Sequence, residues 1–562
     1  LFSGRLIQLQ GLDGPSVATV ALAKRTTTVV LPAHRGDIVD AAGNTLATTV
    51  DRPNLLVDQT LVHLYKKVVG GRTQVVGIPG AAQDLAPVLS LPVDVVTRRL
   101  TGTSRGAVLA QGVTPEVARE VLRLPIPGVN LQPASRRIYP AGTTAANVLG
   151  FVSIADGKAL DGMELARDDD LAGRPGSLRY EHAADAARTR IPTGVTEEVD
   201  PQPGRTVQLT IVQDLQWRAQ QLLEAQVKAV GADSGDAVIM DPRTGRVLAL
   251  ATAPTFDPNA YGVAPDADRG DRPLLDVFEP GSTAKVITMA AALEEHAVTP
   301  TTPLVVPGAL HIGGTTFHDA ESHGTEKLTV AGVLAQSSNI GTILTGEKLR
   351  SATLYDYMHR FGLGTRTGVG LGESPGLLVP HQRWTDSQRY TVMFGQGMSM
   401  TALQAASVFS TIANDGVRLQ PQVVAGERDA AGVLHTRPAP PGVRVVSADT
   451  ARQLRLMMEN VVGDNGTAAK AEVPGYRVAG KTGTAQAVVN GVYDGYTASF
   501  IGMAPADDPA LVIAVILQRP TRGHFGGEVA APVFQQLMTY ALAQRKIPPT
   551  GTKAPEIPLQ WR

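Results

Sequence analysis

A serine and a lysine three residues apart, Ser282 and Lys285, are the first pair in the chain that could perform nucleophilic chemistry. A Pro-Gly dipeptide precedes the serine and helix-favouring residues follow as far as Leu293, so Ser282 is predicted at a helix start. Residues three apart share a helix face, so the amine can reach the hydroxyl. It can take the serine proton only if burial or a nearby charge lowers its pKa. The pair predicts a serine nucleophile with a lysine base.

A second polar motif, Ser337-Ser338-Asn339, lies about fifty residues further along in an apolar stretch. Burial of these side chains without hydrogen-bond partners would be unfavourable. Taken alone, the motif also fits a Ser/Asn loop or a helix end, just as Ser282 and Lys285 alone fit a capped surface helix. The burial predicts polar partners for Ser337 and Asn339.

A third motif, Lys481-Thr482-Gly483-Thr484, closes a strand-like alternation that begins at Tyr476. Its lysine and threonine side chains can bind a carboxylate, and glycine lets a ligand approach the backbone closely. A β-turn with an exposed lysine is the simpler alternative. All three motifs occur once, in the order found in penicillin-recognising serine enzymes, which favours the catalytic interpretation.

Composition limits the elements that could position these residues. A chain of 562 residues is longer than one hydrophobic core usually organises, so two or more domains are expected. With 51 basic against 52 acidic residues, the chain carries no polyanion-binding signal, and no nucleic acid is expected as a partner. The 58 Gly and 39 Pro indicate many turns, hence mixed α and β structure. The absence of cysteine excludes disulfides and Cys-ligated metals.

The first half alternates short apolar runs with turn clusters, which predicts an irregular, strand-rich domain that ends near Pro203. Periodicity predicts the following elements: a helix at 115–124, a strand at 207–211, a helix at 215–230, a hairpin of 237–240 with 247–251, a buried strand at 511–517, and a helix through Val533, Leu537 and Tyr540. The Pro-rich end, residues 548–562, is predicted to be an extended tail.

The chain resembles the class B penicillin-binding proteins over nearly its whole length. In the first half the resemblance is carried by Arg35-Gly36-Asp37-Ile38-Val39-Asp40 with Gly43, by Arg137-Ile138-Tyr139-Pro140, and by Gly162-Met163-Glu164-Leu165 followed by Leu171, Gly173 and Gly176. It implies an α+β fold, with a penicillin-recognising serine transpeptidase domain, an antiparallel sheet flanked by helices, on an irregular strand-rich pedestal. The implied domains are a pedestal or dimerisation-type domain at 1–203, the transpeptidase domain at 204–547 and the tail at 548–562.

Residue by residue, the resemblance implies a two-step acyl transfer. Ser282 attacks the penultimate D-alanine carbonyl of a stem peptide, with Lys285 as its base. Ser337 helps relay the proton to the leaving D-alanine, and Asn339 holds the peptide amide.

The third motif is expected to recognise the end of that donor peptide. Lys481 supplies positive charge, Thr482 and Thr484 bind the terminal carboxylate beside Gly483, and the backbone N–H groups of Ser282 and Thr484 form the oxyanion hole. A second peptide's amine then resolves the acyl-enzyme. No metal or organic cofactor is expected.

The resemblance also implies partners and a location. Stem peptides and β-lactam antibiotics are the expected ligands, and a polytopic glycan polymerase of the shape, elongation, division and sporulation family is the expected protein partner. The approach from Phe278 to Gly281 and the Lys-Thr-Gly strand favour the septal, cell-division type, with an elongation-type enzyme as the alternative. Cross-linking of peptidoglycan happens outside the cell membrane, so an extracytoplasmic domain anchored by a preceding N-terminal transmembrane helix is expected.

Three rival interpretations fit parts of the sequence. The segment from Gly475 to Thr482 matches a phosphate-binding loop, but lacks the preceding strand and the following helix that such a loop needs. A β-lactamase or carboxypeptidase relative would share the three motifs, but no Glu-x-x-Leu-Asn segment for deacylation is present. An inactive scaffold is disfavoured because Ser282, Lys285 and Lys481 are all intact.

Two other segments carry polar residues that could be functional. His311, His318, Asp319, Glu321 and His323 could ligate a metal, but their spacing in a Gly-rich segment favours a polar surface loop. The segment Gly395-Gln396-Gly397 followed by Thr401 and Gln404 resembles another family motif, and by itself predicts a loop and a capping box at a helix start.

Overall fold

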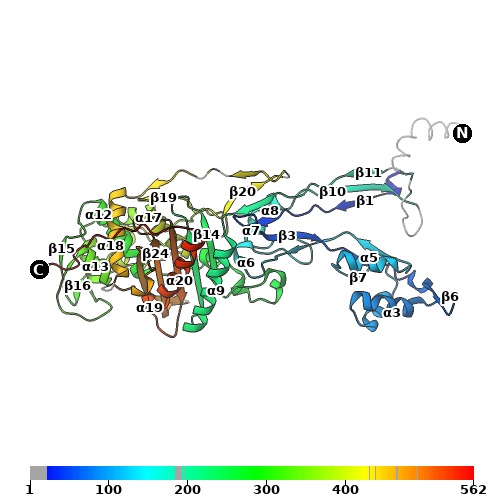
Figure 1. Cartoon of the computed structure of the whole chain (residues 1–562), viewed down its shortest axis with the longest axis horizontal. Helices are drawn as coiled ribbons and strands as arrows, with labels where there is room; N and C mark the ends of the chain where they lie inside the picture. The colour runs from blue at the N-terminus through cyan, green and yellow to red at the C-terminus, as the bar shows by residue number, and fades with distance from the viewer. Residues whose placement is uncertain are drawn as a thin grey trace, which may run out of the picture.

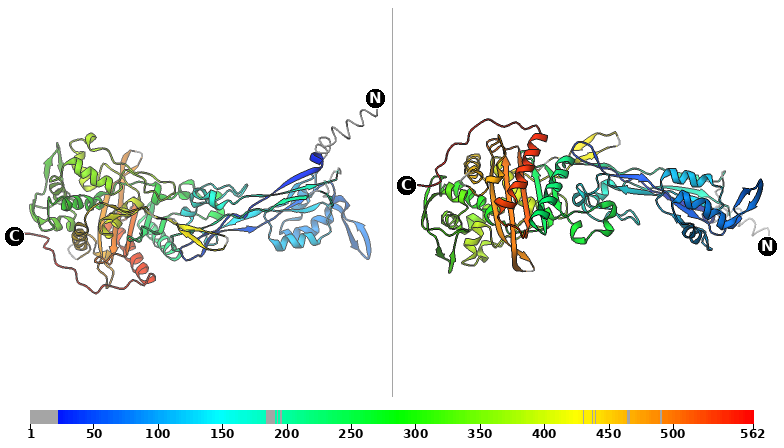
Figure 2. Two further views of the ribbon diagram at one scale, coloured as in Figure 1. Left: turned by 90° about the horizontal axis from the view of Figure 1, so that it is seen from above. Right: turned by 60° about the horizontal axis from the view of Figure 1, so that its bottom comes forward.

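The molecule is elongated in this computed structural model (Figures 1 and 2), which describes residues 22–183, 191, 193–194, 196–429, 431–436, 438, 440–463, 466–489 and 491–562. The N-terminal part, residues 22–203, forms a strand-rich arm, and the C-terminal part, residues 204–562, forms a helix-covered sheet. The start of the predicted first domain, residues 1–21, lies outside the described residues. None of the described helices is long and apolar enough to span a membrane.

The C-terminal part is built on one antiparallel sheet of five strands, in the order β14-β13-β25-β24-β23. These are β13 (Ser234–Met240), β14 (Val247–Ala253), β23 (Ala479–Val489), β24 (Val492–Ala504) and β25 (Leu511–Gln518). The predicted hairpin is confirmed as β13 and β14, and the predicted apolar strand as β25 at the centre. β23 is an edge strand, which pairs on one side only, with β24.

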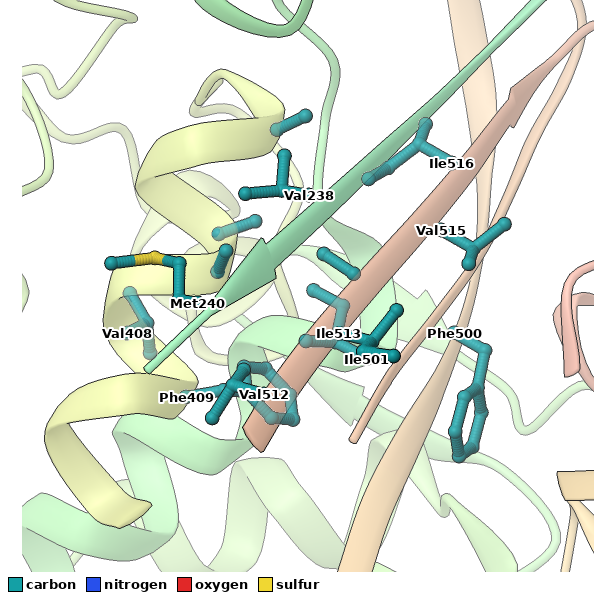
Figure 3. Packing of buried hydrophobic residues seen from close by; sticks show 14 of the residues in the cluster. Val238, Met240, Val408, Phe409, Phe500, Ile501, Val512, Ile513, Val515 and Ile516 are labelled. Carbon is teal, nitrogen blue, oxygen red and sulfur yellow. The ribbon is translucent and has the colours of Figure 1, made fainter. Parts of the chain in front are cut away.

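Helices cover both faces of this sheet. Phe500 on β24 packs edge-to-face against Phe534 of α20 (Ala531–Gln544), while its neighbour Ile501 faces Val408 and Phe409 of α17 (Ala402–Ala413), as Figure 3 shows for Ile501, Val408 and Phe409. The alternation follows from the period of two along a strand. Because both faces are covered, β14 and β25 are almost continuous apolar runs rather than alternating ones, and β13 is buried along its whole length.

The helices of the C-terminal part surround the sheet and form a lobe at its β23 side. They are α9 (Gln213–Val230), α10 (Asp266–Arg269), α11 (Arg272–Leu275), α12 (Lys285–Glu294), α13 (Val330–Gln336), α14 (Asn339–Gly346), α15 (Ser351–Arg360), α16 (Gln388–Thr391), α17 (Ala402–Ala413), α18 (Ala448–Val462), α19 (Gly526–Val529) and α20 (Ala531–Gln544). The predicted helices at 215–230 and around Val533 are α9 and α20. Short strand pairs complete the lobe: β15 (Pro303–Val306) with β18 (Glu326–Thr329), β16 (Leu310–Ile312) with β17 (Thr315–Phe317), and β19 (Val417–Arg418) with β22 (Val443–Arg444).

The N-terminal part is strand-rich, as predicted. Its strands are β1 (Thr26–Leu31), β2 (Ile38–Val39), β3 (Thr45–Asp51), β4 (Asn54–Val57), β5 (Lys66–Val69), β6 (Arg72–Val75), β7 (Ala107–Ala110), β8 (Val129–Gln132), β9 (Ser135–Ile138), β10 (Gly176–Glu181) and β11 (Thr196–Val199). Its helices are α3 (Gly77–Leu89), α4 (Val93–Leu100), α5 (Pro115–Arg123), α6 (Ala146–Leu149), α7 (Gly162–Ala166) and α8 (Asp168–Leu171). The predicted helix at 115–124 is confirmed as α5. Residues between Leu55 and Leu131 have a hydrophobic core of their own.

One sheet joins the two parts. Strand β12 (Thr206–Leu209), the predicted strand after residue 203, pairs in parallel with β2 and antiparallel with β20 (Val424–Arg428), which pairs in turn with β21 (Leu434–Thr436). Ile38 and Leu46 of the N-terminal part belong to the same hydrophobic core as the main sheet. Packing is therefore continuous across the predicted domain boundary, which stays a prediction.

A buried carboxylate ties the N-terminal motifs together. Glu164 has no exposed surface. It accepts hydrogen bonds from Arg35 Nε at 2.6 Å, from Arg137 Nε at 2.7 Å and from the Tyr139 hydroxyl at 3.3 Å. Arg137 also donates to the carbonyl of Gly36 at 2.8 Å. The segments that carry the resemblance in the first half thus meet at one charged centre.

The C-terminal tail is extended, as predicted, but it is not free. It runs along the outside of the C-terminal part (Figures 1 and 2) to the β15–β18 pair. Thr329 N donates to the carbonyl of Leu559 at 3.0 Å, and Trp561 Nε1 donates to the carbonyl of Leu304 at 2.9 Å. Thr329 is the N-cap of α13, so the tail is attached to the helix that leads to Ser337.

Candidate active site

Ser282 lies in a single 3-10 turn, Gly281–Ala284, that runs directly into α12, as the helix-start prediction required. Gly281 has φ of +51°, a conformation that favours glycine, and its N–H donates to the carbonyl of Gly395 at 3.0 Å. Gly397 N donates to Glu279 Oε1 at 2.9 Å. The Gly-Gln-Gly loop therefore holds the approach to Ser282.

The capping box predicted from Thr401 and Gln404 is confirmed. The Thr401 side chain accepts from Gln404 N, and the Gln404 side chain accepts from Thr401 N, at the start of α17. Gln404 Nε2 also donates to the carbonyl of Thr365 at 2.7 Å. Both side chains satisfy backbone groups, so Thr401 and Gln404 have the structural role that their pattern predicted.

Lys285 is completely buried, and its amine points to the second motif. Nζ donates to the Ser337 carbonyl at 2.5 Å, to Asn339 Oδ1 at 2.8 Å and to Ser337 Oγ at 3.3 Å. Among the described residues, the Ser282 hydroxyl has no hydrogen-bond partner, so the predicted bond to Lys285 is not formed here. Burial lowers the pKa of Lys285 to about 7, against the opposing charge of Asp319.

The second motif is a sharp turn between α13 and α14. Ser337 has φ of +62° and ψ of +34°, a left-handed conformation that costs a non-glycine residue ~1–2 kcal/mol. Ser338 then caps α14, since its Oγ accepts from Gly341 N at 2.8 Å. The turn directs both the carbonyl and the hydroxyl of Ser337 at Lys285. The polar partners expected for Ser337 and Asn339 are therefore present.

The third motif lies near the start of β23 rather than at the end of a strand, so its predicted position was wrong. The strand begins at Ala479, and Lys481 to Thr484 all pair with β24. A turn with Gly475 at φ of +83° keeps the preceding segment out of the sheet. Because Lys481 and Thr482 lie in a strand that no helix follows, the phosphate-loop interpretation is also wrong.

Lys481 completes the contact between the motifs. It is completely buried, and its Nζ donates to Ser337 Oγ at 2.8 Å and to the Thr482 carbonyl at 3.2 Å. Burial, and then the nearby Lys285, lowers the pKa of Lys481 well below its ordinary value. One hydroxyl thus lies between two amines that cannot both readily hold a proton. This arrangement can supply a neutral amine as base and a hydroxyl that relays protons.

Close packing brings β23 beside the Ser282 turn. A side chain on Gly483 would lie 2.3 Å from Ser499 Oγ, 2.9 Å from the Thr283 methyl and 3.0 Å from the Pro280 carbonyl oxygen. Gly483 therefore lets two elements approach, whereas the sequence suggested close approach of a ligand.

The two threonines of the third motif have polar partners of their own. Thr482 Oγ1 lies 2.8 Å from Thr467 Oγ1 and 3.2 Å from Lys481 Nζ. Thr484 is half-buried, and its Oγ1 accepts from Gly526 N at 3.2 Å. Both hydroxyls are thus held on the strand that carries Lys481, beside the Ser282 turn.

The loop after β17, which carries the possible metal ligands other than His311 of β16, has a different use. His311, His318 and Glu321 are exposed. Among the described residues, no group of three or more His, Cys, Asp or Glu side chains could hold a metal ion. Asp319 instead accepts hydrogen bonds from the N–H groups of Asn339 and Ile340. The sequence does not reveal this contact, since no local pattern links residues twenty positions apart.

The fold and the three adjoining motifs define a penicillin-recognising serine enzyme. A family model for the penicillin-binding protein transpeptidase domain matches residues 235–539, and one for the penicillin-binding protein dimerisation domain matches residues 30–209. The chain belongs to the class B penicillin-binding proteins.

Relatives and solved structures agree over most of the chain. Penicillin-binding protein PbpB of Mycolicibacterium smegmatis is 36% identical, covering 99% of this chain and 90% of that protein. Peptidoglycan D,D-transpeptidase FtsI of Escherichia coli is 34% identical, covering 92% and 86%. The crystal structure of penicillin-binding protein 3 from Mycobacterium tuberculosis, complexed with aztreonam, has 32% identity and a TM-score of 0.73, covering 95% of this chain and all of that one.

Proposed function

We propose that this chain is a peptidoglycan D,D-transpeptidase that cross-links stem peptides through an acyl-enzyme on Ser282, in septal cell-wall synthesis. The single observation that carries the proposal is the Ser337 hydroxyl held between the buried amines of Lys285 and Lys481, beside the Ser282 turn. Escherichia coli FtsI, which is similar over most of the chain, bears the name peptidoglycan D,D-transpeptidase.

Acylation begins with transfer of the Ser282 proton to neutral Lys285. Ser282 Oγ then bonds to the penultimate D-alanine carbonyl carbon, and the amide C–N bond breaks. The departing D-alanine nitrogen receives a proton through Ser337, which contacts both amines. Backbone N–H groups of Ser282 and Thr484 stabilise the oxyanion, at ~3 kcal/mol for each well-placed donor.

The terminal carboxylate of the donor peptide is bound by Lys481, Thr482 and Thr484 along the edge strand β23. Burial disfavours the charge of Lys481. A bound carboxylate would raise the pKa of Lys481 again, because an opposite charge favours the ammonium. Peptides that end in a carboxylate thus create the positive charge that binds them. Asn339 holds the peptide amide, and the amine of a second stem peptide releases the acyl group.

We further propose that the enzyme works outside the cell membrane, anchored by an N-terminal helix, with a polytopic glycan polymerase of the shape, elongation, division and sporulation family. The arm formed by the N-terminal part, with its separate core, suits such a contact. Co-purification of the polymerase with the membrane-anchored protein tests the pairing. Localisation of a fluorescent fusion tests the role, since a septal band supports division and lateral patches favour the elongation-type alternative.

Mass spectrometry after exposure to a β-lactam tests the central step. We expect one stable adduct on the peptide that contains Ser282 and none in Ser282→Ala. Folded protein without an adduct would contradict the proposal. Rapid loss of the adduct with turnover of the β-lactam would instead favour the β-lactamase alternative. Release of D-alanine without formation of cross-linked peptide would favour a carboxypeptidase.

A further inference from the structure

We propose that Asp319, supported by His323, is a positioning residue that holds the Ser337–Asn339 turn against Lys285. The inference rests on the proposed acylation of Ser282. It gives a role to the loop between β17 and β18, which its sequence predicted to be a polar surface loop rather than a metal site.

Asp319 holds the turn through the backbone at the start of α14. Its Oδ1 accepts from Asn339 N at 2.5 Å and from Ile340 N at 2.9 Å, the first two N–H groups of α14. Such N–H groups have no partner within their own helix, and an anion there is stabilised by the helix dipole. The carboxylate therefore fixes the point where the turn ends and α14 begins.

The same loop also orients the side chain of Asn339. Asn339 Nδ2 donates to the carbonyl of His318 at 3.1 Å, which leaves Oδ1 to accept from Lys285 Nζ at 2.8 Å. Backbone and side chain of Asn339 are thus both held by adjacent residues of one loop. Through Asn339, the position of the loop determines where the Lys285 amine lies.

His323 supports the carboxylate from behind. Its Nε2 lies 3.0 Å from Asp319 Oδ2, and its Nδ1 lies 2.6 Å from the carbonyl of Gly324. Because both ring nitrogens face acceptors, the doubly protonated ring fits best. Glu326 Oε2 is also near, at 3.9 Å from Nδ1. Burial opposes the charge, but the bonds to Gly324 and Asp319 raise the pKa of His323 overall.

Asp319 and His323 also influence the pKa of Lys285. Burial lowers the pKa of Lys285, and the charge of Asp319 opposes this by favouring the protonated amine. Removal of the Asp319 charge would lower the pKa of Lys285 further. Removal of the His323 charge would leave Asp319 uncompensated and raise that pKa. The two changes therefore have opposite signs, which loss of structure alone would not produce.

The test compares the rate of acylation by a fluorescent penicillin between pH 5 and 9 in Asp319→Asn, His323→Gln and unchanged protein. We expect Asp319→Asn to acylate ~10–100-fold more slowly, because catalysis is sensitive to misplacement of the reacting groups. Its acidic midpoint should move to lower pH. His323→Gln, which keeps a donor for Asp319 without the charge, should move the midpoint to higher pH.

Two matched controls separate positioning from general weakening. Glu321→Gln changes an exposed carboxylate of the same loop and should leave rate and midpoint unchanged. Ser338→Ala removes a different acceptor from the start of α14 and so reports the effect of a weaker cap alone. Equal losses in Ser338→Ala and Asp319→Asn, with unmoved midpoints, would overturn the inference. Wild-type rates in both Asp319→Asn and His323→Gln would also overturn the inference. If the protein without any substitution never acylates, the proposed function is refuted instead.

Discussion

Ser337 links the two lysines through an unusual backbone conformation. Its left-handed φ of +62° places the carbonyl and the hydroxyl on the same side, where Lys285 and Lys481 contact them. Strained non-glycine residues persist only where surrounding contacts over-determine them. Here the contacts come from α12, β23 and the Asp319 loop, so this turn depends on all three.

Acylation should rise with pH through about 7. Burial lowers the pKa of Lys285 to about 7, and only the neutral amine can accept the Ser282 proton. Below that pH, each unit should reduce the rate of acylation ~10-fold, because one pKa unit is a factor of ten in the neutral fraction. Stopped-flow acylation by a penicillin at constant ionic strength measures this. A rate that is flat from pH 5 to 9 would contradict Lys285 as the base.

The sequence predicted which residues form the candidate active site, but not the contacts between them. Motif spacing selected Ser282, Lys285 and Lys481, and the structure brings the Ser282 turn beside both lysines. That Lys285 bonds to Ser337 and Asn339 rather than to Ser282 depends on how α12 packs against a turn fifty residues later. Contacts of this kind have no local signature, and neither does the cap by Asp319.

At the scale of elements, the packing of β23 against the Ser282 turn depends on Gly483. In Gly483→Ala the new methyl group would meet Ser499 and the Pro280 carbonyl oxygen, so the strand and the turn must separate. We expect a loss of stability of ~1–3 kcal/mol, as for other overpacked sites, and a lower acylation rate.

Thermal unfolding and β-lactam acylation measure the two effects of Gly483→Ala. Gly372→Ala is the matched control, because a side chain there meets nothing within 4 Å and its φ is not positive. Unaltered stability and acylation in Gly483→Ala would show that the close approach is not required.

Elements with a strong local pattern were predicted well. Helix α5, the β13–β14 hairpin, strand β25 and the cap at Thr401 all follow from periodicity or cap chemistry within a few residues. The start of β23 was predicted wrongly, because the extent of this strand is determined by pairing with β24 rather than by alternation in its own sequence. Strand limits depend on partners more than helix limits do.

For the molecule as a whole, the buried charge centre at Glu164 joins distant segments of the elongated arm. Removal of one partner from a buried ion pair typically costs ~3–5 kcal/mol, so Glu164→Gln should destabilise the N-terminal part strongly. The exposed pair of Asp94 and Arg98 is the control, since Asp94→Asn should cost below ~1 kcal/mol.

Hydrogen exchange resolved along the chain is the appropriate measurement, because unfolding of a multi-domain chain need not be two-state. Faster exchange in Glu164→Gln should be concentrated in α7, β9 and β2. Acylation by a small β-lactam should persist, since the Ser282 turn lies in the C-terminal part. Unchanged exchange in Glu164→Gln would refute the role of this centre.

Sequence could not predict how the two parts join. The sheet that contains β2, β9, β12 and β20 draws strands from four distant segments, and the tail returns from α20 to β18. From composition, the boundary near residue 203 and the tail were both predicted to be irregular segments. Only the folded molecule shows that both are bound to structured elements.

The docked tail also bears on the order in which the chain can fold during synthesis. Strand β13 pairs with β25, and Trp561 packs beside β15, so both earlier strands wait for a partner that is made much later in the chain. Until that partner has been synthesised, the apolar strands are unpaired, a state that exposes the growing polypeptide to aggregation and proteolysis. The lobe that holds Ser337 is therefore not complete until synthesis has reached Trp561.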